Sequence, residues 1–430
     1  MAAAISLRSY LLCTTLSKSQ RTISLNFRDI NLNHTWDIDE LPWTTFSHPS
    51  HKKKYYDLVT ALDPKLVEAI QPHVDSISPD VASAERKIHH AAAQSFLYLF
   101  MSLGSSSSPG CIYTMRSTIP IGAGLGSSAS TFVCIATALL IQCRALSGPH
   151  PDQMTEEAEQ QLERINRWAF VGELLMHGNP SGVDNTVATR GKAVLFKRVD
   201  YAKPPLVTSI KQFPELPLLL VDTRQPKSTA AEVAKVATLK KTHPSTTEHI
   251  LDAIDSITES AHDLITTPNF DPSSQASIAK LGELITVNHG LLYSLGVSHP
   301  KLERLRYLVD RSGIGWTKLT GAGGGGCAIT LLKPTEQDHA DEDGHGASPP
   351  GASALHRLEA ELVEEGFEKY ETTLGGDGVG VLWPAVLRNG SEEEGGVEID
   401  QEKFVDAKGR EGVEKLVGVG AGEGWKFWRL

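Results

Sequence analysis

The feature that most constrains this chain is a glycine-rich turn at residues 120–130, Pro-Ile-Gly-Ala-Gly-Leu-Gly-Ser-Ser-Ala-Ser, which runs directly into an apolar segment. Its three closely spaced glycines remove the Cβ atoms that keep a ligand away from the backbone, so successive N–H groups can point into one concavity. We expect a helix to begin at Ser127 or Ser128, where unpaired N–H groups and the helix dipole favour anions. The turn predicts a phosphate cradle; a tight turn into a core helix is the alternative.

Two better-known phosphate loops are excluded by residue type. A P-loop requires a lysine, and none lies between Gly122 and Ser130. The dinucleotide fingerprint requires a third glycine where this chain has Ser127. The apolar segment Cys111 to Ser117 predicts a strand that leads into the turn, and strand, turn and helix in that order are the context of a phosphate loop.

Composition narrows the class of protein. A chain of 430 residues favours two domains, and 40% apolar with 22% charged residues is typical of a globular protein. The net charge of −11 argues against nucleic-acid binding. Five cysteines without a C-x-x-C pair favour free thiols in a reducing compartment. The longest apolar stretch, about 129–146, is too often interrupted to predict a membrane span.

In the first half of the chain, Ile5 to Cys13 and Thr22 to Phe27 alternate apolar and polar residues and predict a hairpin. Helical spacing predicts helices at Val81 to Leu103 and Thr155 to Met176, and the dense apolar run Leu216 to Asp222 predicts a strand.

In the second half, helices are expected at roughly 246–264, 274–295 and 301–312. Residues 336–353 are acidic and poor in apolar residues, which predicts a disordered insertion. Lys369 to Trp383 is interpreted as a strand pair that turns at residues 375–378. Arg388 to Gly424 is rich in Gly and Glu, and we expect it to form little core.

A second chemical cluster follows the helix at 155–176. It consists of Glu173 and the string His-Gly-Asn-Pro-Ser-Gly-Val-Asp-Asn at 177–185, whose proline and glycines predict a rigid irregular loop. Such a loop can present Asp184 as a base, with Glu173 as a Mg²⁺ ligand. Taken singly, an Asx turn for the aspartate and a solvated helix face for the glutamate are the ordinary alternatives.

Two later stretches carry related features. Pro-Lys-Ser-Thr at 226–229 places polar side chains at the start of a helix, where they can hold an anionic substrate or simply cap the helix. Five glycines within residues 320–326 precede a strand pattern, which indicates backbone packed closely against a nucleotide or against the first glycine turn.

Together, residues 120–130, 177–185 and 320–326 resemble the GHMP family of small-metabolite kinases, which includes galactokinase, homoserine kinase, mevalonate kinase and phosphomevalonate kinase. The string at 177–185 discriminates among these and is most similar to the mevalonate kinase branch. The resemblance extends in order from about Ser6 to Trp383. It implies ATP-dependent phosphorylation of the C5 hydroxyl of mevalonate, in isoprenoid and sterol biosynthesis.

The resemblance assigns roles residue by residue. Asp184 matches the base that accepts the proton of the substrate hydroxyl. Ser128 and Glu173 match the Mg²⁺ ligands, and Thr229 matches an active-site threonine beside the substrate. The ATP-binding matches are Ser117, Gly122, Ala123, Gly124, Leu125, Gly126, Ser127 and Ser128.

The family also implies an α+β fold of two domains. These are an N-terminal ATP-binding domain at 1–222, similar to ribosomal S5 domain 2, and a ferredoxin-like C-terminal domain at 223–387, followed by a tail at 388–430. A cytoplasmic homodimer and inhibition by prenyl diphosphates are further expectations from the family. The net charge and the interrupted apolar stretch predict no nucleic-acid or membrane partner.

One family motif, Pro-Gly-Lys followed by Gly-Glu-His, has no match in the sequence; its lysine helps to hold the base and the transferred phosphate. We expect a missing first exon in the gene model rather than a natural loss. Two alternative functions follow. One is a sibling kinase acting on phosphomevalonate, homoserine or a sugar, and the other is a nucleotide-binding protein without phosphoryl transfer.

Overall fold

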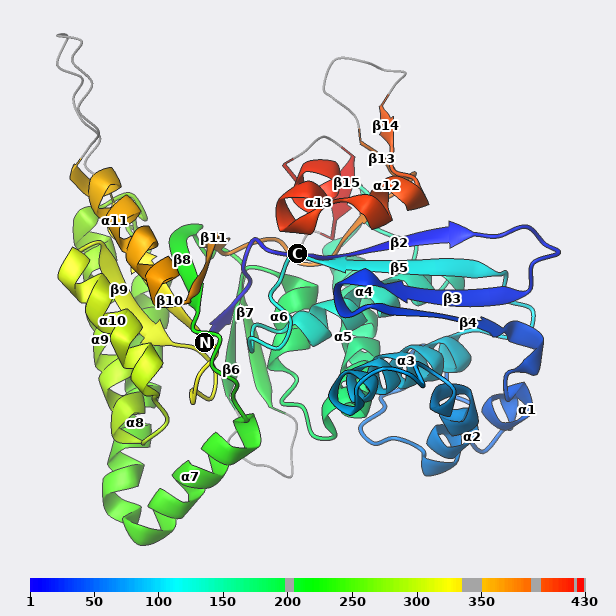
Figure 1. Ribbon diagram of the computed structural model, residues 1–430, viewed down its shortest axis with the longest axis horizontal. Helices are drawn as coiled ribbons and strands as arrows, with labels where there is room; N and C mark the ends of the chain where they lie inside the picture. Colours follow the sequence, from blue (N-terminus) through cyan, green and yellow to red (C-terminus); the bar gives the residue numbers. More distant parts are fainter. Residues whose placement is uncertain (198–204, 335–349, 388–395, 421–423, 429–430) are drawn as a thin grey trace. The chain divides into compact units, whose positions relative to one another are not determined.

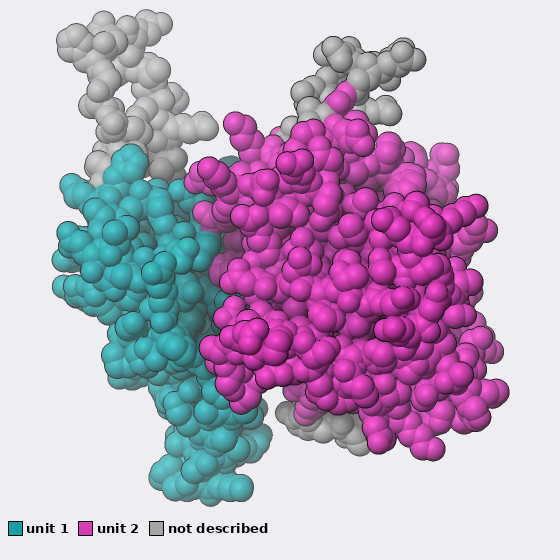
Figure 2. Space-filling view, turned by 45° about the vertical axis from the view of Figure 1, so that its right-hand side comes forward, with its two compact units in different colours: residues 1–6, 121–125, 192–376 teal, residues 7–120, 126–191, 377–430 magenta. Residues whose placement is uncertain are grey.

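The computed structural model describes residues 1–197, 205–334, 350–387, 396–420 and 424–428. The chain divides into two compact units (Figures 1 and 2). Unit 1 contains residues 1–6, 121–125 and 192–376, and unit 2 contains residues 7–120, 126–191 and 377–430. Each unit therefore draws on residues from both sides of the boundary expected at 222. Residues 336–349 of the expected insertion lie outside the described part of the chain.

Unit 2 is built on a four-stranded sheet whose order is β2 (Ser9–Thr15), β5 (Cys111–Ser117), β3 (Thr22–Phe27) and β4 (Leu32–Asp37). The expected hairpin of the first two strands is wrong, because β5 lies between them, antiparallel to β2 and parallel to β3. Alternation predicts a strand and a buried face, but it does not name the partner. The hairpin that does form joins β3 to β4.

Helices cover one face of this sheet. The expected helices are confirmed as α3 (Ser83–Leu103) and α5 (Thr155–His177), and α4 (Ser127–Gln142) begins at Ser127. Phe96, Phe132 and Trp168 lie fully buried in the core that these helices form with the sheet. The other helical elements in the first part of unit 2 are η1 (Arg28–Ile30), η2 (Ile38–Glu40), α1 (Trp43–Ser47) and α2 (Pro64–Asp75).

The C-terminal residues cover the other face (Figure 1). They form β12 (Gly380–Leu382), β13 (Val386–Leu387), β14 (Val397–Glu398), α12 (Gln401–Asp406), α13 (Gly409–Val417) and β15 (Trp425–Phe427). Phe404, Val413 and Val417 are buried against Tyr10 of β2. The expectation that 388–424 forms little core is wrong for residues 396–420, because their few apolar side chains are buried despite the Gly/Glu-rich composition.

Unit 1 contains an antiparallel sheet in the order β11 (Glu368–Leu374), β8 (Leu216–Asp222), β10 (Cys327–Leu332) and β9 (Gly315–Leu319). The strand pair expected at 369–383 is wrong, since β11 pairs with β8 and β12 with β15. A smaller sheet joins β1 (Ala2–Ala3), β6 (Ala193–Lys197) and β7 (Leu206–Ile210).

The helices of unit 1 are α7 (Thr229–Thr242), α8 (Pro244–Thr266), α9 (Gln275–Ser294), α10 (Pro300–Ser312) and α11 (Pro350–Glu364). Leu302 and Leu305 of α10 pack with Leu219 of β8 in the core between α10 and the four-stranded sheet of unit 1. Within the described ranges, none of the helices in either unit combines the length and the apolar character that a membrane span needs.

A substitution at Phe404 tests whether α12 and α13 belong to the core of unit 2. Its side chain is 2% exposed, so Phe404→Ala is expected to lower the free energy of unfolding by about 3–5 kcal/mol. Urea denaturation followed by tryptophan fluorescence measures the loss. Leu58→Ala is the control, because Leu58 is 64% exposed. Equal effects of the two substitutions would contradict this placement.

Candidate active site

The glycine turn has a left-handed backbone at alternate residues. The φ angles of Gly122, Gly124 and Gly126 are 77°, 77° and 74°, a region that strains any residue with a side chain. Gly126 is the N-cap of α4, so the N–H groups of Ser127 and Ser128 lie in the first turn without intrahelical partners. The order of strand, turn and helix is confirmed, and the start of α4 is suited to an anion.

Asp184 lies against Gly126, the last glycine of the turn, and both residues belong to unit 2. A Cβ built on Gly126 would be 3.3 Å from the Cβ of Asp184 and 3.9 Å from its Oδ2. The expected irregular loop ends at Gly182, because Asp184 is the second residue of helix α6 (Val183–Arg190). Gly182 caps this helix at φ 83°, and its carbonyl accepts a hydrogen bond from Thr186 Oγ1 at 2.7 Å. The carboxylate is thus carried by a helix, which positions it more firmly than a loop would.

Asn185 fixes α6 to its neighbour. Its side chain is 3% exposed, and Nδ2 donates to Oδ1 of Asn166 on α5 at 2.6 Å. Because a buried amide bonded in this way resists rotation, the adjacent Asp184 is held in a set orientation.

Glu173 of α5 is a buried carboxyl beside the start of α4. Burial raises its pKa to about 7, the negative charge of Asp184 adds to the rise, and a hydrogen bond with Ser128 opposes it. Its Oε1 has no hydrogen-bond partner among the described residues. A buried carboxyl oxygen of this kind is costly unless a ligand or ion completes it.

His177 completes a cluster with Ser128, Glu173 and Asp184. Its Nε2 lies 3.1 Å from Ser128 Oγ and 3.9 Å from Glu173 Oε2. Burial lowers the pKa of His177, and the charge of Asp184 partly offsets this. Sequence reasoning did not select His177 as a site residue, although its i,i+4 spacing from Glu173 on one helix places the two side chains on one face.

Ser128 and Glu173 are suited to a hard cation whose remaining coordination positions are filled by a bound ligand. Both offer oxygen atoms, and the unpartnered Oε1 of Glu173 is available to a cation. In the part of the chain that the structure describes, no group of three or more His, Cys, Asp or Glu side chains is placed to hold a metal. Mg²⁺ commonly takes one or two protein oxygens and completes its shell with phosphates and water.

Ser117, the last residue of β5, is held by the chain itself. Its hydroxyl donates to the carbonyl of Ile119 at 3.1 Å and lies 3.2 Å from Ser9 Oγ, and its N–H donates to Asp29 Oδ2 at 2.7 Å. Its contact with a nucleotide stays a prediction.

Within unit 1, Lys227 lies beside the glycine turn, although it was not among the site residues expected from the sequence. A Cβ on Gly124 would collide with Nζ of Lys227, and one on Gly326 would lie 3.0 Å from its Cε. The ammonium therefore sits between the two glycine runs. Lys227 belongs to the Lys-Ser-Thr group expected to hold an anion. Its positive charge was the one feature of the sequence that could have identified it as a site residue.

Two further expectations concern unit 1. A Cβ on Gly326 would also be 3.0 Å from the carbonyl oxygen of Ala123, so the second glycine run packs closely against the first. Thr229 is exposed as the first residue of α7, behind the N-cap Ser228. Thr229 and residues 122–125 belong to unit 1, whereas Asp184, Glu173 and Ser128 belong to unit 2.

Comparison with known proteins identifies related sequences. The family described as GHMP kinases N terminal domain matches residues 90–192, and that described as GHMP kinases C terminal matches residues 274–344. The mevalonate kinase of Aspergillus fumigatus is 65% identical over all of this chain and 78% of its own length. The mevalonate kinase of Gibberella zeae is 64% identical over all of this chain and 83% of its own length.

A solved structure shares the fold. The crystal structure of L. major mevalonate kinase in complex with R-mevalonate matches 70% of this chain and 81% of its own, with a TM-score of 0.54 at 24% identity. The fold class expected from the sequence, a mixed α+β kinase with N- and C-terminal GHMP domains, is confirmed.

The pKa of Glu173 gives a pH-dependent prediction. Because its folded pKa is about 7 and its ordinary value is 4.5, the carboxyl is neutral in the folded state and ionised in the unfolded state between these values. Wild-type stability should therefore fall relative to Glu173→Gln as pH rises from 4.5 to 7, by about 3 kcal/mol in total. Urea unfolding in metal-free buffer between pH 5 and 8 measures the difference. Glu156→Gln, an exposed position on the same helix, should show no such trend.

Proposed function

We propose that this chain transfers the γ-phosphate of ATP to the C5 hydroxyl of mevalonate, because it belongs to the mevalonate kinases of the GHMP kinase family. The identity of 65% over the whole chain supports this reaction. The observation that carries it within the structure is the carboxylate of Asp184 beside Gly126, at the start of the helix suited to a phosphate. The product is 5-phosphomevalonate, an intermediate of isoprenoid and sterol biosynthesis.

In this proposal the residues divide the work of phosphoryl transfer. The backbone amides of residues 122–128 bind the phosphates of ATP, and Ser117 contacts the nucleotide upstream of them. Asp184 accepts the proton of the C5 hydroxyl as that oxygen attacks the γ-phosphorus. Thr229 lies on the substrate side, and the ammonium of Lys227 offsets phosphate charge. Phosphoryl transfer needs mainly alignment and charge neutralisation, which this set supplies.

We also propose Mg²⁺ as the cation, with Ser128 and Glu173 as its protein ligands. Bound Mg²⁺ would neutralise charge on the transferring phosphate. A cation at Glu173 favours the ionised carboxylate, which opposes the effect of burial on its pKa. His177, within hydrogen-bond distance of Ser128 Oγ, would hold that hydroxyl in place.

Assembly, regulation and location are proposed from the family alone. We propose a cytoplasmic homodimer, which prenyl diphosphates inhibit. Their diphosphate groups would compete for the amides that bind the phosphates of ATP, because both ligands present the same chemistry to the turn.

A substrate panel tests the reaction. The full chain, expressed from a transcript with a verified 5′ end, is assayed for ADP release with mevalonate, phosphomevalonate, homoserine and galactose, and ³¹P NMR identifies the product. Turnover on mevalonate is expected. Turnover on another alcohol alone would identify a sibling kinase. Binding of ATP without turnover on any alcohol would favour the non-catalytic alternative.

Asp184→Asn tests the base. The substitution preserves shape but cannot accept the proton, so kcat on mevalonate should fall about 10³-fold while the KM for ATP stays within about twofold. Asp152→Asn is the matched control, because Asp152 is an exposed aspartate in a turn, and it should retain wild-type kcat. A fall of less than about tenfold in Asp184→Asn would exclude Asp184 as the general base.

A further inference from the structure

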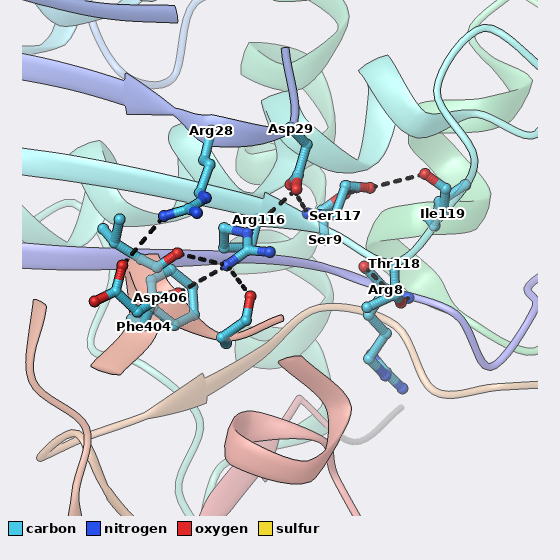
Figure 3. Close-up of polar contacts among 12 residues, drawn as sticks. Arg8, Ser9, Arg28, Asp29, Arg116, Ser117, Thr118, Ile119, Phe404 and Asp406 are labelled. Atoms are coloured by element: carbon cyan, nitrogen blue, oxygen red, sulfur yellow. Dashed lines mark hydrogen bonds and ion pairs between the residues drawn. The ribbon is translucent and has the colours of Figure 1, made fainter. Parts of the chain in front are cut away.

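The segment from Ile399 to Val417, which we call the C-terminal strap, makes polar contacts that its core packing does not require. Phe404, Val413 and Val417 already cover the sheet through apolar contact. In addition, the strap bonds to Arg116 near the end of β5, as Figure 3 shows, and to Thr118 just after it, where the chain leads into the glycine turn. Buried polar bonds fix one specific arrangement more sharply than apolar packing does.

Arg116 is the first of these links. The residue is 3% exposed, and its Nη1 donates to the carbonyls of Phe404, Val405 and Ala407 at 3.0, 3.1 and 2.9 Å. These carbonyls lie at the C-terminal end of α12, where helical carbonyls lack partners and the dipole attracts a cation. The guanidinium thus fastens the end of α12 to β5.

Asp29 carries this link to the next residue of β5. Its Oδ1 accepts from Arg116 Nε at 3.2 Å, and its Oδ2 accepts the N–H of Ser117 at 2.7 Å. Figure 3 shows the carboxylate of Asp29 bonded both to the guanidinium of Arg116 and to the backbone N–H of Ser117. The strap therefore reaches the backbone of Ser117 through two charged groups.

Glu414 of α13 provides a second link, at Thr118. Its Oε1 accepts from Thr118 Oγ1 at 2.8 Å, while its Oε2 accepts from the hydroxyl of Tyr10 on β2 at 3.0 Å. Thr118 is 3% exposed, and its N–H donates to the carbonyl of Arg8 at 2.8 Å. Residues 116, 117 and 118 are therefore all held immediately before the turn.

We propose that Arg116, Thr118 and Glu414 are positioning residues through which the C-terminal strap fixes the upstream flank of the glycine turn for nucleotide binding. The inference rests on the proposed function, in which the turn binds the phosphates of ATP. The downstream flank is already fixed by α4. A loose upstream flank would have to be ordered when the nucleotide binds, and that cost would appear as weaker affinity.

The carboxylate of Glu414 allows a matched comparison. Thr118→Val removes the bond between Glu414 and the flank of the turn, together with the hydroxyl that accepts the N–H of Arg8 at 2.9 Å. Tyr10→Phe removes the other bond to the same carboxylate. Thr118→Ser keeps the hydroxyl. Binding of a non-hydrolysable ATP analogue is measured by calorimetry for these three variants and the wild type. Urea unfolding checks that all four proteins are folded, and turnover on mevalonate is recorded for the wild type.

Thr118→Val should weaken analogue binding about five- to tenfold, because the loosened flank then has to be ordered when the nucleotide binds. Thr118→Ser and Tyr10→Phe should bind within twofold of the wild type. Equal weakening by Tyr10→Phe, or no weakening by Thr118→Val, would overturn the proposal, since the strap would then act on stability alone. If the wild type fails to phosphorylate mevalonate while the binding pattern holds, the proposed function is wrong and the role of the strap stands.

Discussion

The close approach of Asp184 to residue 126 is the constraint on which the rest of unit 2 depends. A side chain at position 126 would be strained, because φ there is positive and a Cβ would be 3.3 Å from the Cβ of Asp184. The approach requires α6 to be docked on α4 and α5, and Asn185 supplies the buried bond that docks it. The same docking brings Glu173 near Asp184, whose charge contributes to its raised pKa. The packing of α6 against Gly126 therefore sets both the position of Asp184 and the charge that acts on Glu173.

The sequence predicted the parts of the site that local chemistry determines. The glycine turn, the strand before it and the helix start at Ser127 depend on residues adjacent in the chain, and all three are found. Asp184 was expected on a loop because Pro180 and two glycines precede it. Gly182 instead starts a helix, which a short polar segment predicts poorly without its packing partners.

Strand pairing and burial between segments far apart in the chain could not be predicted from local sequence. Nothing local to Ser9–Thr15 or Thr22–Phe27 shows that β5, which lies far along the chain, separates them. The Gly/Glu-rich composition of 388–424 likewise hides Phe404 and Val413, whose burial depends on a sheet face formed by the first residues of the chain. Lys227 was visible as a charge, but its position beside Gly124 results from tertiary packing within unit 1.

The bond between Arg116 and the carbonyl of Phe404 joins residues 288 positions apart in sequence. At translation rates of about 5–20 residues per second, a ribosome needs about 15–60 s to make the chain between them. During that interval the guanidinium and the apolar face around Tyr10 have no strap to cover them. The nascent chain therefore presents an incomplete sheet face until residues 399–417 emerge, which makes docking of the strap a late step in the maturation of unit 2.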